Sequence, residues 1–284
     1  MNVTRAIPPL RRVIQGWKRK GETVGFVPTM GNLHAGHAAL LRRAARECDR
    51  VGLSIYVNPL QFGPREDFAS YPRTARDDLA LARAAGVDLV FMPDEGLLYP
   101  PGYGTFVTEE IVSRAACGRF RPGHFRGVAT VVAKLFHLVS PDRAYFGAKD
   151  GQQLRLIEKM VEDLNFPVRI VPVPTVRTRE GLALSSRNRR LSPEDRRSAL
   201  VLSRALRAVR ASFDRGERSV ARLIRAVRPI LAAEPRFRLQ YLEILRRSDF
   251  SPVRRVTEPA VACLAGFIGG GRLIDNVALD RRRA

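Results

Sequence analysis

The sequence predicts an α/β fold in which a doubly wound parallel sheet is followed by a smaller α+β domain. From residue 24 to residue 174, short runs rich in β-branched and aromatic residues alternate with helix-like stretches. After residue 174 this alternation stops, and helical patterns are followed by strand-like runs. We therefore expect a Rossmann-like domain at residues 1–174 and a smaller α+β domain at residues 175–284.

Five strand-like runs are expected in the first domain, at residues 24–28, 51–57, 88–92, 144–146 and 168–173. Between them, apolar residues recur every three or four positions at residues 38–48, 76–85, 128–139 and 152–164, which predicts helices. Helical crossovers make successive strands parallel, and ligands of such sheets bind outside the carboxyl ends of the strands. Functional residues are therefore expected directly after each strand.

The second domain is predicted to open its helical part at Ser192, a capping residue followed by Pro193 and two acids. One long helix is expected from there to about Phe213, and a second helix over about residues 220–233. Strands are expected at residues 237–245, 260–267 and 272–279. Residues 175–190 form the expected hinge, and Arg281–Arg283 is expected to be a frayed tail.

The composition is that of a globular protein of 284 residues, with 45% hydrophobic and 27% charged residues. No apolar run approaches the roughly 18 to 20 residues that cross a bilayer, and the N-terminus is unlike a signal peptide. Cys48, Cys117 and Cys263 are scattered, which argues against a disulfide framework and a structural zinc site. We expect a cytoplasmic protein without a membrane partner.

The formal net charge is +21 and the isoelectric point is near 11.2. Such values suggest a nucleic acid or another anionic partner. However, only five of the 49 basic residues are lysines, and the arginines are spread along segments such as residues 196–228. We interpret them as solvated helix faces, with no nucleic-acid partner; an anionic small-molecule substrate fits the charge equally well.

The run from Thr29 to His37, directly after the first expected strand, carries the most specific chemical pattern. It contains two of the four histidines, His34 and His37, with Gly36 between them, where the backbone can approach a ligand closely. A helix N-terminus attracts phosphate, and two imidazoles beside it can donate hydrogen bonds to phosphoryl oxygens. This context favours a nucleotidyl-transfer site over two polar residues on an exposed turn, and a zinc pair lacks further ligands.

Three other segments supply polar groups at the same predicted edge. Gln61 can bind a hydroxyl or carboxylate of an acceptor, although one Gln is a weak signal. Lys149 can neutralise phosphate charge and Asp150 can accept from a ribose hydroxyl, with a surface ion pair as the alternative. Residues 184–188 supply hydroxyls and a guanidinium suited to a polyphosphate, with a solvated loop as the alternative.

These motifs together resemble the pantothenate synthetase family. The runs PTMGNLHAGH, VNPLQF, YPRT, RPGHFRGV, FGAKDGQQL, GLALSSRN and RLIDN occur in that family's order over nearly the whole chain. The HxGH element alone is shared by a wider nucleotidyltransferase superfamily. The Gln61 segment and the LSSR segment at residues 184–187 point to this family within it.

The resemblance implies an ATP-dependent ligase that condenses (R)-pantoate with β-alanine through a pantoyl adenylate, releasing AMP and pyrophosphate. It also implies a Mg²⁺ requirement and a homodimer whose second domain closes over the ATP site. By similarity, His34, His37 and Lys149 would be catalytic, and Gln61 and Gln153 would bind pantoate and help to place β-alanine. The ATP site would comprise Met30, Gly31, Asn32, Leu33, His34, Ala35, Gly36, His37, Gly147, Ala148, Lys149, Asp150, Val176, Leu184, Ser185, Ser186 and Arg187.

Two positions depart from the family's pattern: Ala148 stands where Glu is usual, and Ala116–Cys117–Gly118 stands where an acidic residue is usual. The sequence does not assign the ligands of the Mg²⁺ ion that the resemblance implies. Two other functions stay open here: a nucleotidyltransferase that adenylylates a phosphorylated acceptor, and a basic nucleic-acid-binding protein. The latter is disfavoured because aromatic residues make up only 7% of the chain and lie mostly in apolar runs.

Overall fold

The computed structural model describes residues 1–64 and 66–280. The chain divides into two compact units. Unit 1 comprises Met1–Glu109, Arg121–Ala148 and Leu156–Pro174; unit 2 comprises Glu110–Phe120, Lys149–Arg155 and Thr175–Ala284. The last change of unit falls after residue 174, and two earlier segments also belong to unit 2. The tail expected at Arg281–Arg283 lies outside the described residues.

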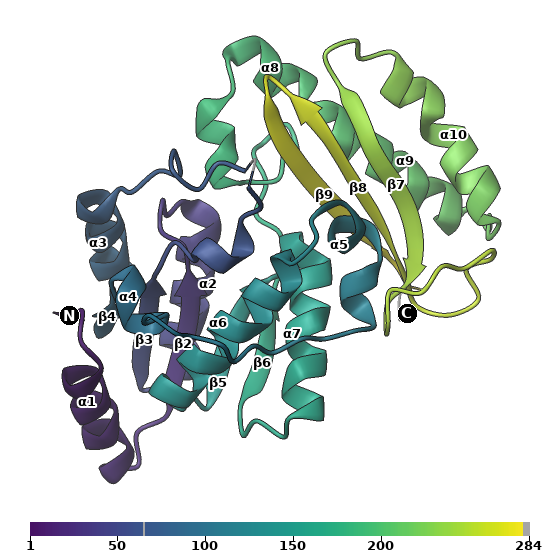
Figure 1. Ribbon diagram of the computed structural model, residues 1–284. Coiled ribbons are helices and arrows are strands. Elements are labelled where there is room, and N and C mark those ends of the chain that lie inside the picture. The colour runs from purple at the N-terminus through teal and green to yellow at the C-terminus, as the bar shows by residue number, and fades with distance from the viewer. Residues whose placement is uncertain (65, 281–284) are drawn as a thin grey trace. The chain divides into compact units, whose positions relative to one another are not determined.

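Unit 1 is built on a six-stranded parallel sheet (Figure 1). Its strand order is β1-β4-β3-β2-β5-β6. The five predicted strands are confirmed as β2 to β6, whereas β1 is a short edge strand whose mixed polar residues give no strand signal. The strands are β1 (Asn2–Thr4), β2 (Val24–Thr29), β3 (Arg50–Ile55), β4 (Leu89–Phe91), β5 (Arg143–Gly147) and β6 (Arg169–Val173).

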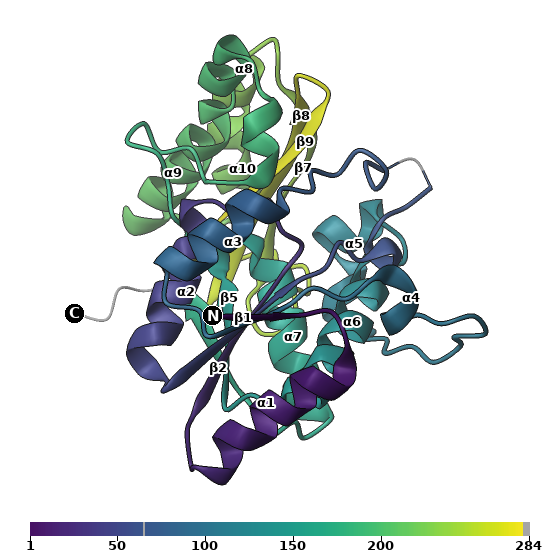
Figure 2. The same ribbon diagram turned by 90° about the vertical axis from the view of Figure 1, so that its left-hand side faces the viewer.

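Helices cover both faces of this sheet (Figure 2). The helices α2 (Ala35–Glu47) and α3 (Ala75–Ala84) lie on one face, and α1 (Ile7–Arg19) and α6 (His124–Val139) lie on the other. Leu41 and Ala44 of α2 are fully buried against Val27 and Leu53 of the sheet. Burial of this apolar face stabilises the packing of α2 on the sheet by about 25 cal/mol per Å² of apolar surface removed from water. Because α2 follows β2 after a short loop, its first turn lies near the carboxyl end of β2.

The remaining short elements connect the larger ones. Helix α4 (Glu95–Leu98) belongs to unit 1, and α5 (Ala116–Phe120) belongs to unit 2. Helix α7 (Gly151–Asp163) begins in unit 2 and continues in unit 1. Four 3-10 turns complete the described chain: η1 (Pro59–Gln61), η2 (Val112–Arg114), η3 (Ala148–Asp150) and η4 (Ser186–Arg190).

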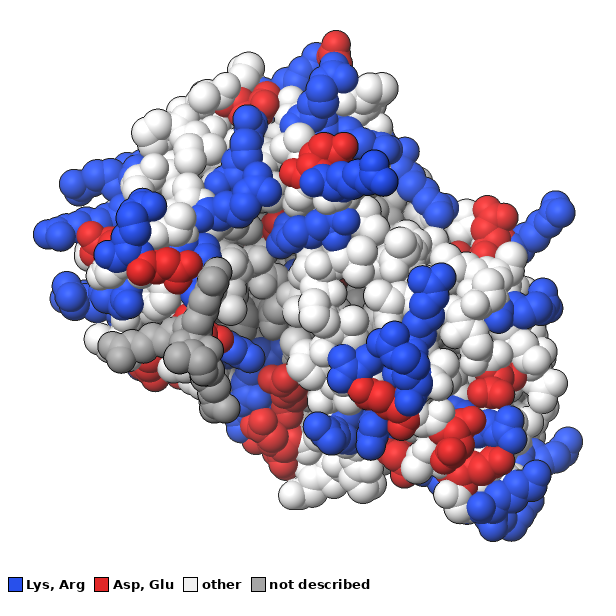
Figure 3. Space-filling model, turned by 180° about the vertical axis from the view of Figure 1, so that it is seen from behind, with Lys and Arg blue, Asp and Glu red and all other residues white. Residues whose placement is uncertain are grey.

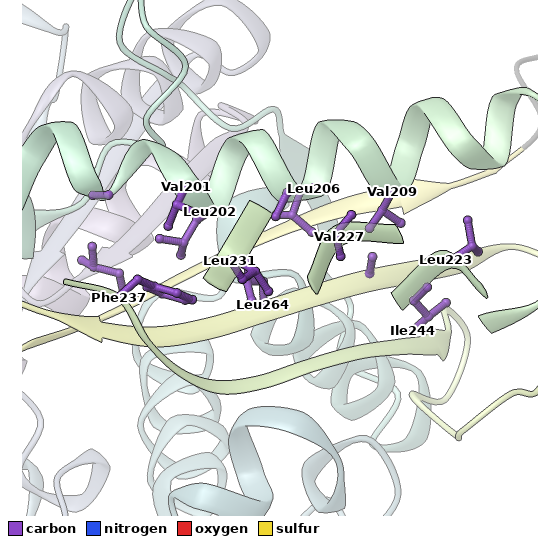
Figure 4. Packing of buried hydrophobic residues seen from close by; sticks show 14 of the residues in the cluster. Val201, Leu202, Leu206, Val209, Leu223, Val227, Leu231, Phe237, Ile244 and Leu264 are labelled. Atoms are coloured by element: carbon purple, nitrogen blue, oxygen red, sulfur yellow. The ribbon is translucent and has the colours of Figure 1, made fainter. Parts of the chain in front are cut away.

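Unit 2 contains a three-stranded antiparallel sheet, with one face covered by helices (Figure 4). The sheet has the order β7 (Arg238–Arg246), β8 (Ala260–Ile268) and β9 (Gly271–Leu279), which confirms the three predicted strands. Alternate residues of β8, such as Ala262 and Leu264, pack against Leu206 and Val227 of the covering helices α9 (Leu200–Asp214) and α10 (Val220–Ala232). The period of two along β8 thus directs one set of side chains into this core.

The two early segments of unit 2 contact residues of the same small sheet. The ring of Phe120 in α5 stacks on that of Tyr241 in β7, with centroids 5.4 Å apart and an angle of 18° between the planes. Cys117 Sγ accepts a hydrogen bond from Arg272 of β9 at 3.6 Å. These contacts join residues far apart in the chain, which explains why the sequence alone places this segment in the first domain.

The prediction of one continuous helix from Pro193 to about Phe213 is wrong. The structure has α8 (Pro193–Ser198) and α9, separated at the buried Ala199. The Leu202 N–H donates to the Ala199 carbonyl oxygen at 3.3 Å, so a tighter i to i+3 turn interrupts the α-helical pattern. The predicted start is confirmed, since Ser192 Oγ accepts from the Asp195 N–H at 3.0 Å.

Candidate active site

Three loops that carry predicted site residues follow the carboxyl ends of three adjacent strands of unit 1. The loop from Met30 follows β2, the Gln61 segment follows β3, and Ala148 follows β5. The strand order reverses between β2 and β5: from β2 the chain extends through β3 to β4, and it then returns to the other side of β2. Ligands of open α/β sheets bind outside the carboxyl ends at such a reversal, so the loop after β2 is the first candidate.

His34 and His37 form a reciprocal capping box at the start of α2. His34 Nδ1 accepts a hydrogen bond from the Gly36 N–H at 3.0 Å, and His37 Nδ1 accepts from the His34 N–H at 3.2 Å. The two ring centroids lie 4.1 Å apart. An imidazole nitrogen that accepts carries no proton, so the proton of each neutral ring lies on Nε2. Nε2 is therefore the donor nitrogen of both rings, as a hydrogen bond to a phosphoryl oxygen requires.

Gly36 makes this arrangement possible. A Cβ at position 36 would lie 2.7 Å from Cε1 and 2.9 Å from Nδ1 of His34. Because glycine has no side chain, the His34 ring can fold back over the first turn of α2. The space beside this glycine is thus taken by the His34 ring, and the expected approach to a ligand stays a prediction.

Asp78, in α3, fixes the loop before the two histidines and was not predicted. Its side chain is 2% exposed. Oδ1 accepts from the Leu33 N–H at 2.7 Å and from Thr74 Oγ1 at 3.1 Å, and Oδ2 accepts from the Asn32 N–H at 3.0 Å. A buried carboxylate with several donors is strongly held, so Asp78 makes the loop rigid. Its sequence position gives no signal, because an acid in the first turn of a helix is ordinary.

Gln61 is buried at the end of η1, and its side chain is oriented by Asn58. Asn58 Nδ2 donates to Gln61 Oε1 at 2.9 Å and to the Gly127 carbonyl oxygen at 3.0 Å. A Cβ on Gly127 would lie 2.1 Å from the Leu60 carbonyl oxygen, so only glycine lets α6 approach η1 this closely. The side-chain oxygen of Gln61 is thus held by Asn58, which also binds the backbone of α6.

The RPGHF motif holds the backbone of the same residue. The Gln61 carbonyl oxygen lies 3.1 Å from Arg121 Nη2 and 2.8 Å from His124 Nδ1. Arg121 also donates from Nε to Glu66 Oε1 at 2.6 Å. Burial raises the pKa of Glu66, but the hydrogen bond and charge of Arg121, with smaller contributions from the Gly63 N–H and His124, lower that pKa overall. Arg121 and His124 therefore hold the main chain at Gln61, a contact the sequence does not reveal.

Lys149, Asp150 and Gln153 lie in unit 2. Lys149 Nζ lies 3.5 Å from Asp150 Oδ1, and the side chains are 17% and 45% exposed respectively. Gln153 is half-buried in the first turn of α7. Its neighbour Gln152 is structural: Nε2 donates to the Val112 and Ala115 carbonyl oxygens, each at 2.8 Å, and Oε1 accepts from the Cys117 N–H at 3.0 Å.

The predicted hinge residues of unit 2 form a short paired structure. The Leu184 N–H donates to the Val176 carbonyl oxygen at 2.9 Å. Ser185 caps η4, and its Oγ accepts from the Arg187 N–H at 3.3 Å; Ser186 and Arg187 begin that turn. Lys149 and Ser185 line one small recess together with Leu182, Ala183, Asn188, Leu202, Leu273, Ile274 and Asp275. Unit 2 therefore brings a cation and a hydroxyl from two predicted segments together.

The two departures from the family's pattern occupy different settings. Ala148 is the first residue of η3. Ala116 is fully buried with a φ of 39°, and Cys117 is 6% exposed. Since Gln152 binds the Cys117 N–H, this segment is part of the interior of unit 2.

The described residues contain no ready-made metal cluster, so a metal ion would need substrate atoms among its ligands. Across residues 1–64 and 66–280, no group of three or more His, Cys, Asp or Glu side chains is arranged to hold a metal. Mg²⁺ keeps several waters and binds through one or two carboxylates together with substrate phosphates. Asp150 is a carboxylate of the right kind beside Lys149.

Figure 3 shows basic side chains spread over one face of the molecule and interspersed with acidic ones. Many arginines pair with acids, as Arg50 does with Glu22 and Asp88 at 2.8 and 3.3 Å. On this face the basic residues are spread out and not gathered into one tract (Figure 3). In the part of the chain that the structure describes, no helix is both long and apolar enough to cross a bilayer.

A family model for pantoate-beta-alanine ligase matches residues 2–278. The chain belongs to the pantoate-beta-alanine ligase family. It is 53% identical to a pantothenate synthetase of Heliobacterium modesticaldum over 92% of this chain and 93% of that protein. It is 48% identical to a pantothenate synthetase of Moorella thermoacetica over 99% of each chain.

Solved structures of family members have the same fold. A pantothenate synthetase of Thermus thermophilus has a TM-score of 0.94 and 49% identity, over 99% of this chain and 100% of the other. A pantoate-beta-alanine ligase of Francisella tularensis, solved in complex with beta-gamma ATP and beta-alanine, has a TM-score of 0.81 and 32% identity over 98% of each chain. The predicted family and the predicted α/β fold are confirmed. The two alternative functions are not favoured by these matches.

Proposed function

We propose that this protein condenses (R)-pantoate with β-alanine at the expense of ATP, through a pantoyl adenylate. A carboxylate oxygen of pantoate attacks the α-phosphorus of ATP, the bond from that phosphorus to the bridging oxygen breaks, and pyrophosphate leaves. The amine of β-alanine then attacks the carbonyl carbon, the bond to AMP breaks, and the amine loses a proton. The products are pantothenate, AMP and pyrophosphate.

The observation that carries this proposal is the reciprocal capping of His34 and His37 at the strand reversal. Attack on phosphorus needs neutralisation of growing charge and in-line positioning more than a covalent nucleophile. Two Nε2 donors at a helix N-terminus supply such groups, because N–H donors and the helix dipole both favour negative charge. Family membership directs the choice of acceptor toward pantoate rather than a phosphorylated compound.

The other site residues take roles that follow from their chemistry. Lys149 would neutralise phosphate charge, and Ser185 with Arg187 would bind further phosphate oxygens. Gln61, whose amide is oriented by Asn58, would bind pantoate through its donor and acceptor atoms, and Gln153 would help to place β-alanine. These assignments rest on family resemblance together with the contacts described above.

We further propose that ATP binds as its Mg²⁺ complex, with Asp150 beside Lys149 as a protein carboxylate near the phosphates. Bound Mg²⁺ would neutralise charge on the phosphate oxygens. The family resemblance also supports a cytoplasmic homodimer. Chelation with EDTA followed by Mg²⁺ addition tests the metal requirement, and sedimentation equilibrium tests the dimer.

Product analysis with single omissions tests the reaction. Pyrophosphate should appear with ATP and pantoate alone, whereas AMP and pantothenate should also require β-alanine. ADP and phosphate as products would exclude the adenylate route. Faster turnover with a phosphorylated acceptor than with pantoate would favour the other nucleotidyltransferase reaction.

A further inference from the structure

A residue of the small sheet binds the backbone of Lys149. Asn276 Nδ2, in β9, donates to the Lys149 carbonyl oxygen at 2.7 Å. The two residues are 127 positions apart in the sequence and belong to the same unit. The hydrogen bond holds the main chain of the η3 turn and leaves the ammonium group of Lys149 to other partners. Asn276 therefore fixes the position of the Lys149 main chain and does not act on the charge of its side chain.

Asn276 is itself held by its neighbour. The Asn276 N–H donates to Asp275 Oδ1 at 2.8 Å. Asp275 is 3% exposed, and both its oxygens accept from Arg177, at 2.6 Å from Nη1 and 2.9 Å from Nη2. A bidentate guanidinium-carboxylate pair of this kind fixes geometry as well as charge. The position of Asn276 is therefore supported by a partly buried ion pair.

The same ion pair holds the second phosphate-binding segment. Arg177 Nη1 also donates to the Gly181 carbonyl oxygen at 3.2 Å, and Arg177 pairs with Ala183 across an antiparallel bridge. Ser185 follows two residues later and lines the same recess as Lys149 and Asp275. Two adjacent residues of β9 thus tie both segments to one strand.

We propose that the Asp275–Asn276 pair is a positioning device that sets the spacing between Lys149 and Ser185 for phosphate binding. This inference rests on the proposed function, in which both side chains contact the phosphates of ATP. Charge stabilisation in a transition state depends on position within about half an ångström, so a displaced Lys149 backbone should slow transfer more than it weakens ATP binding. Asn276 touches no reacting atom and is a positioning residue.

The test is a double-mutant cycle between Asn276 and Lys149. Asn276→Asp keeps the size of the side chain but presents an oxygen to the Lys149 carbonyl in place of a donor. We expect the turnover of pantoate-dependent pyrophosphate release to fall about 10- to 100-fold, with the KM for ATP changed less than about threefold. In a Lys149→Ala background the same substitution should change turnover less than about twofold, because the group it positions is absent.

Gln240→Glu is the matched control. Gln240 lies on β7 of the same sheet, its Oε1 accepts from Arg272 at 2.9 Å, and the change adds the same charge to that sheet without touching η3. It should leave turnover within about twofold of the wild type. If Asn276→Asp does not fold, judged by its thermal unfolding, Asn276→Ala enters the same cycle with the same expectation.

The outcomes separate this inference from the proposed function. Wild-type protein that releases no pyrophosphate from ATP and pantoate would overturn the proposed function. Active wild type with an equally active Asn276 variant would overturn only the positioning role. Equal losses in the wild-type and Lys149→Ala backgrounds would show a general structural role and would also overturn it.

Discussion

The Leu33 N–H donates to Asp78 Oδ1 at 2.7 Å, which joins α3 to the loop that precedes the two histidines. The other oxygen of the same carboxylate accepts from the Asn32 N–H at 3.0 Å. Two consecutive backbone donors are therefore held by one buried side chain. The position of the capping box relative to the sheet depends on this carboxylate.

Asp78→Asn should lower both stability and adenylation. Asparagine keeps the shape but offers one acceptor oxygen, so a backbone N–H would face an NH₂ group. We expect a loss of about 1–3 kcal/mol in the free energy of unfolding, measured by urea denaturation, and slower pyrophosphate release. The exposed neighbour provides the control, since Asp77→Asn should change stability by less than about 0.5 kcal/mol. Equal effects of the two substitutions would contradict the anchoring role.

His34→Asn separates the capping role of this residue from its proposed catalytic role. Asparagine is a good N-cap but lacks the Nε2 donor. Adenylation should fall by on the order of 10² or more while the unfolding temperature stays close to that of the wild type. His34→Ala should lose the cap as well, at a further cost of about 0.5–2 kcal/mol. The control is His137→Asn, at an exposed position of α6. If His34→Asn adenylates pantoate as fast as this control, His34 has only a structural role.

Gln61→Ala should chiefly weaken the use of pantoate. The substitution removes the amide that Asn58 orients, while the histidine loop is unchanged. Steady-state kinetics should show a raised KM for pantoate and an ATP KM within about threefold of the wild type. Gln15→Ala, at an exposed position of α1, is the control. Small and equal changes in the KM values for pantoate and ATP would argue against a role of Gln61 in pantoate binding.

Ala148→Glu tests the departure from the family's pattern. An exposed ion pair contributes only about 0–1 kcal/mol, and Lys149 already has Asp150 at 3.5 Å. We expect an active wild type and a change in turnover or ATP affinity of less than about tenfold, which corresponds to about 1.4 kcal/mol. The comparison is made at saturating Mg²⁺. An inert wild type with turnover restored by Ala148→Glu would mean that the chemistry requires the glutamate.

The lowered pKa of Glu66 predicts a pH-dependent contribution to stability. Its ordinary pKa is 4.5; burial raises this pKa, but the hydrogen bond and charge of Arg121, together with the Gly63 N–H, lower it overall. A carboxyl whose folded pKa is lowered stabilises the protein above its unfolded pKa, and this contribution is lost as pH falls through the folded pKa. The difference in unfolding free energy between wild type and Glu66→Gln should be constant from about pH 7 to 5 and shrink below about 4.5. Denaturation curves across this range check it, and a difference that does not shrink contradicts it.

The sequence predicts the sheet well because its signals are local. The apolar runs of β2 and β8 and the cap at Ser192 are each encoded within a few residues. By contrast, β1 is a three-residue edge strand, and the break at Ala199 lies in an uninterrupted amphipathic pattern. Neither the edge strand β1 nor the break at Ala199 changes the periodicity of apolar residues, so the sequence does not predict them.

The site residues likewise divide into those that a local motif reveals and those that only the folded chain reveals. The histidine pair is recognisable because both residues and their glycine lie within one turn. The positioning residues Asp78, Arg121 and Asn276 act across 45, 60 and 127 residues respectively, so only the folded chain reveals them. Their contacts go to backbone atoms, and backbone atoms carry no sequence signature.

The most direct test of the adenylate mechanism is the fate of oxygen-18 from the carboxylate of pantoate. In the proposed reaction one carboxylate oxygen bonds to the α-phosphorus and stays there when β-alanine displaces AMP. Mass spectrometry should therefore find one labelled oxygen in AMP and none in pyrophosphate. Release of ADP in place of AMP, with the label in inorganic phosphate, would show attack at the γ-phosphorus and would contradict the account.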